Sequence, residues 1–311
     1  MFMSEFRPES PSVAKFIKTA TMFYIDSELE MEFEKIVEKD VREIKKELLG
    51  ITTESGLRDY IKCQPKSLDR ITSVLNISEE KFKRIITMLR VQKGFTPTSE
   101  WTLDSLRTQM LESPEWMSTI CNLFMRGRDM EEYQSTIPNF YLTNFSIDAT
   151  TIGRLASDDD IRRLVKKGYE GKYNNKLGDS FFNKVSKTII DKCKKTGLTY
   201  SVKEVVPFAE KQIGIAIPDV KNPRLMIDVT YGITTSSAQT KLAKDAEVIR
   251  GKLRERNIGK SDKEKKLYIS IVDGAGWVAR QADLNKLHRY SDYLINLKNI
   301  EMMNDIIDYY L

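Results

Sequence analysis

Three short segments rich in β-branched residues constrain the fold of this chain most strongly. They are "QIGIAI" at 212–217, "LMIDVTY" at 225–231 and "LYISIV" at 267–272, and their length and composition are typical of buried strands. A cationic amphipathic segment, "AQTKLAKDAEVIRGKLRERN", separates the second from the third. A helix in that position is the ordinary way to join two parallel strands. The pattern therefore predicts an α/β fold in which a mixed β-sheet is flanked by helices.

The N-terminal half has a helical pattern instead. From about residue 15 to residue 126, apolar residues recur at three- and four-residue spacing. The stretch "SLDRITSVLNISEEKFKRIITMLRVQKG" predicts two short helices around "NIS", with Ser78 as an N-cap. This is the outline of a helix-turn-helix, in which Arg84 and neighbouring cations would face phosphates. An ordinary helical pair is the alternative.

The helical periodicity breaks up between "IPNFYLTNFSIDATT" and the glycine-bearing "GYEGKYNNKLGD". We therefore expect a helical domain over residues 1–150, involved in DNA recognition, and an α/β domain over residues 151–311. Within the second domain, "SFFNKVSKTIIDKCKKTG" is a predicted helix that ends at Gly197, and "TYSVKEVVPFA" contains a further strand.

The amino-acid composition limits which kinds of catalytic and metal site the chain could contain. The 31% of charged residues nearly cancel, leaving a net charge of +5, so attraction to polyanions has to come from local clusters. The chain has three scattered cysteines and one histidine, His288, which argues against a zinc site and excludes a multi-histidine metal site. Catalysis would rest on carboxylates and lysines. No stretch resembles a leader or a membrane span, so we expect a cytoplasmic protein without a membrane partner.

Asp228 and Thr230 share one face of the predicted strand "LMIDVTY". A buried carboxylate without a partner is costly, so Asp228 should accept hydrogen bonds, form an ion pair or bind a cation. Asp219 lies nine residues earlier, beyond the bend "VKNP". A hairpin could bring the two carboxylates together around one Mg²⁺. Local hydrogen bonding of Asp219 within the turn is the alternative.

Two segments carry a resemblance to a known family. "PD", eight residues and then "DVT" resembles the PD-(D/E)xK signature of the restriction-endonuclease superfamily, and "LYISIVDGAGWVARQADLNKLHRYSDYLINLKNI" is similar to the end of type II restriction enzymes of the DpnII-like group. The residues that carry the second likeness are Asp273, Gly274, Gly276, Trp277, Asp292, Tyr293, Leu294, Asn296 and Leu297. The resemblance implies a Mg²⁺-dependent type II restriction endonuclease that cuts double-stranded DNA at a short specific sequence. It also implies a homodimer, with Asp219 and Asp228 as the catalytic metal ligands.

The motif lysine of this family, which would stabilise transition-state charge, is replaced by Thr230. Lys241 or Lys244 on the following helix could supply the cation, and Lys241 is the candidate catalytic lysine. A non-catalytic, sequence-specific DNA-binding protein and a repair or recombination nuclease of the same superfamily therefore remain alternatives.

The second departure from the family pattern concerns the first of its two metal-binding carboxylates. If the hairpin is centred near Asn222, the position opposite Asp228 falls near Gly214 or Ile215, where the family often has aspartate. Glu210 or a carboxylate on a helix would then have to complete the metal site. We retain Asp219 as the predicted ligand.

Hydroxyls and cations indicate where DNA would be contacted. "TTSSAQTK" could hold a phosphate at the start of a helix, with simple helix capping as the alternative. "RRLVKKGYEGKYNNK" interleaves cations with tyrosines, which suits contact with a DNA backbone, although a solvated surface would look the same. The predicted DNA-contacting residues are Arg84, Lys166, Lys167, Lys172, Tyr173, Ser236, Ser237, Gln239 and Lys244.

Overall fold

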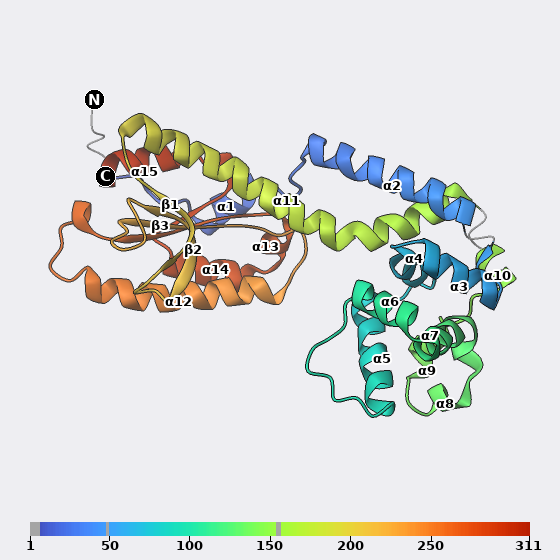
Figure 1. The fold of residues 1–311 in the computed structure, drawn as a ribbon. Helices are drawn as coiled ribbons and strands as arrows, with labels where there is room; N and C mark the ends of the chain where they lie inside the picture. Colours follow the sequence, from blue (N-terminus) through green and yellow to red (C-terminus); the bar gives the residue numbers. More distant parts are fainter. Residues whose placement is uncertain (1–6, 48–49, 154–156) are drawn as a thin grey trace. The chain divides into compact units, whose positions relative to one another are not determined.

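The computed structural model describes residues 7–47, 50–153 and 157–311. The chain forms two compact units (Figure 1). The α/β unit combines Met1–Leu29 with Asn174–Leu311, and the helical unit is Glu30–Tyr173. The predicted boundary near residue 150 is therefore corrected in two ways: the first residues belong to the α/β unit, and the second boundary lies inside a helix.

One mixed sheet organises the α/β unit. Its strands follow the order of the sequence: β1 (Ser201–Val206), β2 (Lys211–Ile217), β3 (Leu225–Tyr231), β4 (Leu267–Asp273) and β5 (Tyr293–Ile295). β1 to β3 form an antiparallel meander, whereas β4 pairs in parallel with both β3 and β5. The predicted mixed α/β sheet is confirmed, including the parallel strand that follows the cationic helix.

Helices cover both faces of this sheet (Figure 1). They are α1 (Val13–Thr19), the C-terminal part of α11 (Asp158–Thr196), α12 (Ser237–Arg256), α13 (Ala275–Ala279), α14 (Gln281–Tyr290) and α15 (Met302–Tyr310). Strand residues such as Ile227 pack with α11 and α15, whereas Met226 and Tyr268 pack with α1, α12 and α14. Because both faces are buried, the central strands are apolar almost throughout, and Asp228 is an exception that needs partners.

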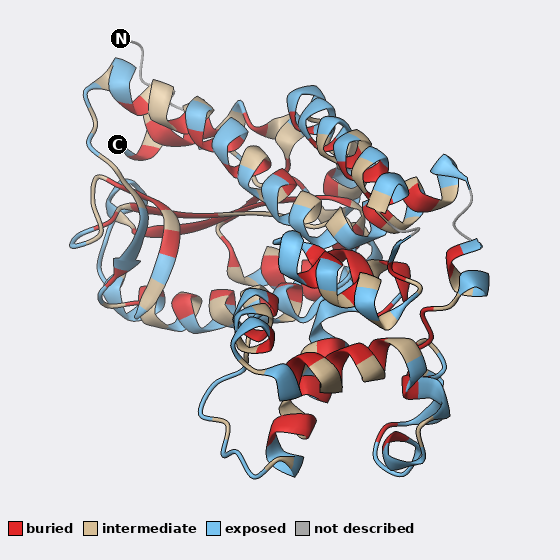
Figure 2. Cartoon of the chain, turned by 45° about the vertical axis from the view of Figure 1, so that its right-hand side comes forward, coloured by how far each residue is buried: buried red, intermediate tan, exposed pale blue. Residues whose placement is uncertain are grey.

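Helices make up the other unit. They are α2 (Ser27–Glu47), α3 (Glu54–Cys63), α4 (Ser67–Val74), α5 (Glu79–Gln92), α6 (Leu103–Glu112), α7 (Pro114–Arg126), α8 (Glu131–Gln134), α9 (Asn139–Leu142), α10 (Ala149–Gly153) and the first part of α11. In the longer helices of this unit, buried residues alternate with exposed ones at helical spacing (Figure 2), as amphipathic periodicity requires. Ser78 caps α5 as predicted.

The expected break at "GYEGKYNNKLGD" is wrong, because α11 runs through it for 39 residues. Glycine in a helix interior costs about 1 kcal/mol relative to alanine. Tertiary packing offsets that cost at both ends of α11: Ile161 and Val165 are buried in the core of the helical unit, and Phe181 and Val185 in the core of the α/β unit. No loop therefore marks the junction between the units.

Residues that follow β4 and β5, together with the last residue of β4, attach the N-terminal segment to the sheet. The buried carboxylate of Asp273 accepts hydrogen bonds from the backbone N–H groups of Thr21 (2.7 Å) and Leu297 (3.0 Å). The Asn296 side chain donates to the carbonyl of Phe16 at 3.0 Å. Burial raises the pKa of Asp273, and its backbone hydrogen bonds act in the opposite direction. These contacts explain why the first residues join the α/β unit.

Gly274 and Gly276 let the loop after β3 approach α13. A Cβ at Gly274 would collide with the backbone carbonyl of Gly232, and a Cβ at Gly276 with that of Thr234. Gly274 also has a φ of +109°.

Because strain of this kind costs about 2 kcal/mol, Gly274→Ala should lower the free energy of unfolding by about that amount. Gly251→Ala is the control: its Cβ would meet nothing within 4 Å on α12, so stability should stay level or rise. Urea unfolding of both variants compares them, and equal effects would contradict the prediction.

Candidate functional site

Asp228 lies in the middle of β3 and is 7% exposed. Its Oδ2 accepts hydrogen bonds from Lys211 Nζ at 2.6 Å and from the Tyr268 hydroxyl at 2.7 Å. Its Oδ1 accepts one from the backbone N–H of Gly214 at 3.2 Å. Of the three partners expected for a buried carboxylate there, the structure provides hydrogen bonds and an ion pair.

Lys211 also connects Asp228 to a second carboxylate. Its Nζ lies 3.5 Å from Oδ2 of Asp245, which projects from α12. The Lys211 ammonium from β2 therefore lies near two carboxylates, Asp228 from β3 and Asp245 from α12. We call Lys211, Asp228, Asp245 and the adjacent Tyr268 the Asp228 cluster. Tyr268 is fully buried. Its burial is the main cause that raises the pKa of its hydroxyl, and the nearby Asp228 carboxylate is the next. The hydroxyl therefore stays protonated and able to donate a hydrogen bond.

The course of β2 explains how Lys211 reaches this position. β2 pairs with β3 through residues 215 to 217, and the N–H of Gly214 bonds to the Asp228 side chain. A Cβ at Gly214 would lie 2.9 Å from the carbonyl oxygen of Ile227, so glycine allows the close approach there. The Lys211 side chain then extends along the α12 face of the sheet.

The structure does not bring Asp219 and Asp228 together. Asp219 lies in the turn after β2, where its Oδ1 accepts the N–H groups of Lys221 and Asn222, both at 2.8 Å. Ile217 stands opposite Leu225, so Asp219 and Asp228 differ by about five strand positions, or about 16 Å. The shared metal site predicted for them is corrected to the turn alternative, because the hairpin extends too far beyond β2.

Lys241 and Lys244 lie on the exposed surface of α12. Lys241 precedes Asp245 by one helical turn. In the part of the chain that the structure describes, neither lysine forms a hydrogen bond or ion pair. The cation beside Asp228 is Lys211 instead, which sequence reasoning missed along with Tyr268. Asp245 is a helix carboxylate, the kind of residue that the sequence offered besides Glu210 without naming it. The one available signal was the position of Lys211 at the start of "KQIGIAI", near the expected first carboxylate.

Two carboxylates around one cation are a possible ligand set for Mg²⁺. Among residues 7–47, 50–153 and 157–311, no group of three or more His, Cys, Asp or Glu side chains could hold a metal. Mg²⁺ is, however, often held by one or two carboxylates, with waters and substrate phosphates completing its coordination. Asp228 and Asp245 fit that pattern if the Lys211 ammonium moves aside, and Asp219 does not.

The hydroxyl-rich segment before α12 forms a capping box. Gln239 accepts the N–H of Ser236 at 2.8 Å, and the Ser236 side chain accepts from the helix backbone. Gln239 is 3% exposed, whereas Ser237 is exposed. The capping alternative is therefore what the structure has, and Gln239 is too buried to contact DNA directly.

The α4–α5 pair is present, but α5 cations contact other parts of the helical unit. Arg84 forms an ion pair with Glu100. Lys81 lies 4.8 Å from the centre of the Tyr141 ring. The structure therefore supports the helical pair and gives no separate support to Arg84 as a phosphate contact.

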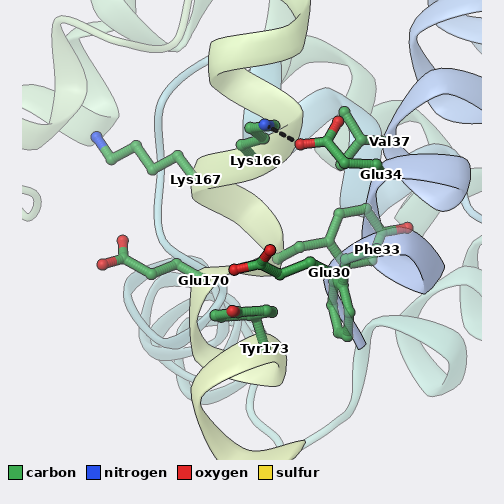
Figure 3. Close-up of a pocket in the computed structure, with 9 residues that line it drawn as sticks. Glu30, Phe33, Glu34, Val37, Lys166, Lys167, Glu170 and Tyr173 are labelled. Atoms are coloured by element: carbon green, nitrogen blue, oxygen red, sulfur yellow. Dashed lines mark hydrogen bonds and ion pairs between the residues drawn. The ribbon is translucent and has the colours of Figure 1, made fainter. Parts of the chain in front are cut away.

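The cations predicted between residues 162 and 176 lie on α11, not on a loop. Lys166 pairs with Glu34, Lys167 donates to Asn76 Oδ1 at 2.6 Å, and Lys172 lies 5.6 Å from the Tyr169 ring centre. Lys166, Lys167 and Tyr173 line a pocket of about 600 Å³ between α2 and α11 (Figure 3). Its other lining residues are Glu30, Phe33, Glu34, Val37, Tyr169 and Glu170. Three glutamates in this lining oppose the binding of a phosphate.

The chain has little similarity to proteins of known family or structure. No protein-family model matches the chain, and none of the curated proteins does. A solved structure, a restriction endonuclease PspGI–substrate DNA complex, is 14% identical and covers 80% of this chain and 96% of its own, with a TM-score of 0.31. Similarity at this level carries no weight for fold or function. Among the described residues, no helix is long and apolar enough to cross a membrane.

Proposed function

We propose that the chain is a Mg²⁺-dependent endonuclease that hydrolyses double-stranded DNA at the Asp228 cluster, at a short specific sequence. One observation carries the proposal: the carboxylates of Asp228 and Asp245 lie 2.6 and 3.5 Å from the same Lys211 nitrogen. Two carboxylates from a central strand and from the helix that follows it thus converge on one position for a cation.

Asp228 and Asp245 would hold the ion. When bound, Mg²⁺ supplies charge stabilisation to the phosphodiester and lowers the pKa of a coordinated water. Hydrogen bonds from Tyr268 and from the Gly214 N–H keep the Asp228 carboxylate in one orientation, so this ligand needs little rearrangement.

Lys211 has a second role in this proposal. When Mg²⁺ occupies the position between the carboxylates, the Lys211 ammonium would be displaced but would stay beside the site, because Lys211 belongs to β2. There it could donate hydrogen bonds to phosphoryl oxygens. A positioned cation stabilises negative charge that develops in the transition state. Lys211 would thus supply the charge that the resemblance assigns to the lysine replaced by Thr230. A homodimer, which matches a twofold-symmetric DNA sequence, belongs to the same proposal.

The test is incubation of the purified chain with unmethylated plasmid and phage DNA, with Mg²⁺ and with EDTA. Discrete fragments that require Mg²⁺ are the expected result. A smear of products would reject sequence specificity and favour a repair or recombination nuclease. Intact DNA under both conditions would overturn the proposed cleavage.

A second candidate has its own supporting observation. Lys211 already forms an ion pair with Asp228, so this buried carboxylate is satisfied without a metal ion. This favours a protein that does not hydrolyse DNA, and a non-catalytic protein that binds double-stranded DNA is the second candidate. Intact DNA together with a sequence-selective band shift in EDTA would establish this candidate.

A further inference from the structure

The loop between α12 and β4, residues 257–266, is closed at its base. The side chain of Asn257 donates to the carbonyl of Lys266 at 2.9 Å and accepts the Lys266 N–H at 2.8 Å. Further along, the Ser261 N–H bonds to Glu264 at 3.0 Å. Local bonds therefore order the loop, so a ligand would not have to bear that entropic cost.

Cations outnumber unpaired carboxylates around this loop. Asp262 is paired with Lys265 and Arg7, and Glu264 is bonded to Ser261. The exposed cations of the loop and its flanks are Lys221, Arg254, Arg256, Lys260 and Lys263. Of these, neither Arg254 nor Lys260 has a hydrogen-bond or ion-pair partner in the described part of the chain.

The pKa values of Lys266 and Glu264 are affected by the cations around this loop. Burial lowers the pKa of Lys266 most, and the nearby charges of Lys260, Arg224 and Arg256 lower it further. The pKa of Glu264 is lowered, first by its hydrogen bonds from Ser261 and then also by Arg224 and Lys260. The neighbouring cations are thus smaller contributors to both shifts, and they act in the direction expected for a surface that attracts anions.

Ile258 stands at the start of this loop with 80% of its surface exposed. Arg256 and Lys260 flank it, and the next residue, Gly259, has a φ of +72°. An isolated exposed apolar residue is common on protein surfaces. Here it lies between two exposed cations at the start of the loop, and proteins that bind the minor groove frequently combine basic side chains with an apolar residue inserted between base steps.

We infer that the loop 257–266 is a contact surface for duplex DNA, in which Lys260 and Lys263 contact phosphates and Ile258 enters the minor groove. This inference rests on the proposed function and adds where the substrate lies. In the β3–β4 register, Leu225 stands opposite Leu267 and Asp228 opposite Ser270. The loop ends at Lys266, four strand positions from Ser270 and therefore about 13 Å from the level of Asp228, which is about four base-pair steps along a duplex.

The experiment measures duplex binding in EDTA, so that cleavage cannot interfere. The affinity of each variant for a fluorescent duplex is followed by anisotropy over a series of salt concentrations. Each lost phosphate contact makes the slope of log K against log salt less negative by about 0.9, so the slope for the double variant K260Q/K263Q should be less negative by about 2. The control K194Q/K195Q removes the same charge from the exposed end of α11 and should leave the slope unchanged.

Ile258→Ser adds a separate readout. It should weaken binding at every salt concentration without changing the slope, because no charge is removed. Thermal unfolding of each variant checks that these exposed substitutions leave the fold intact. An unchanged slope in K260Q/K263Q would overturn the inference.

Failure of the contact surface and failure of the proposed function give different results. If the wild-type protein cuts DNA but K260Q/K263Q binds with the wild-type slope, the surface is wrong and the function stands. If the wild-type protein neither binds nor cuts duplex DNA, both are wrong. Binding of phosphatidylserine vesicles that is lost in K260Q/K263Q, without any duplex binding, would assign the loop to a membrane surface instead.

Discussion

Plasmid DNA should remain essentially intact when Asp228 is replaced by asparagine. Asp228→Asn removes the negative charge from the central carboxylate of the cluster but keeps a side chain of the same shape. Loss of a preorganised electrostatic group in an active site typically costs at least about 100-fold in rate, and the variant should also lose a Mg²⁺ ligand. The single-turnover rate at which supercoiled plasmid is cut in Mg²⁺ measures the effect.

Asp219→Asn is the matched control for that experiment. It makes the same chemical change in the same hairpin, but Asp219 bonds to the turn backbone and not to the cluster. Asparagine also accepts such turn hydrogen bonds, so cleavage should stay within about twofold of wild type. Equal loss in both variants would contradict the placement of Asp219 outside the site.

Local pattern predicted the sheet because each strand is short, apolar and β-branched. The cationic segment before β4 also predicted correctly that β4 pairs in parallel with β3. The extent of the two units could not be predicted in the same way. The N-terminal segment joins the sheet through Asp273 and Asn296, and those hydrogen bonds span more than 250 positions in the sequence.

The partners of Asp228 depended on tertiary structure for a similar reason. Alternation along β3 placed Asp228 on a face opposite Ile227, which the structure confirms. Whether Lys211 reaches it depends on the close approach of β2 at Gly214, and Asp245 depends on how α12 packs on the sheet. Asp219 and Asp228 suggested a pair because spacing shows which residue types occur near a bend, but not how far the hairpin extends.

The predicted DNA contacts on α11 illustrate the same limit for charged residues. A run of lysines with tyrosines indicates charge but not its partners. Lys166 and Lys167 are each bound by a residue distant in sequence, Glu34 or Asn76. By contrast, Lys260 in the loop 257–266 has no such partner in the described chain and the Lys263 ammonium contacts only the ring of Tyr309, and no motif had distinguished this loop beforehand.

Replacing Lys211 with methionine should make the stability of the protein depend on Mg²⁺. The substitution leaves Asp228 buried without its counterion, and breaking a buried ion pair in this way costs about 3 kcal/mol of unfolding free energy. A divalent ion that binds Asp228 and Asp245 only in the folded state would restore stability by mass action. In the wild-type protein, Lys211 competes with the ion, so the stabilisation should be smaller. Urea unfolding in EDTA and in millimolar Mg²⁺ measures both effects without requiring activity.

Lys252→Met is the control, since it removes the same group from the pair with Glu210, whose side chain is 81% exposed. Exposed pairs contribute less than about 1 kcal/mol, so this variant should be nearly as stable as wild type and no more responsive to Mg²⁺. A Lys211→Met variant that is destabilised but not rescued by Mg²⁺ would show that the Asp228 cluster is only a structural ion pair. Rescue specific to Lys211→Met would instead mean that Asp228 and Asp245 bind Mg²⁺ in the folded protein, and that Lys211 occupies the position of the ion in the wild-type protein.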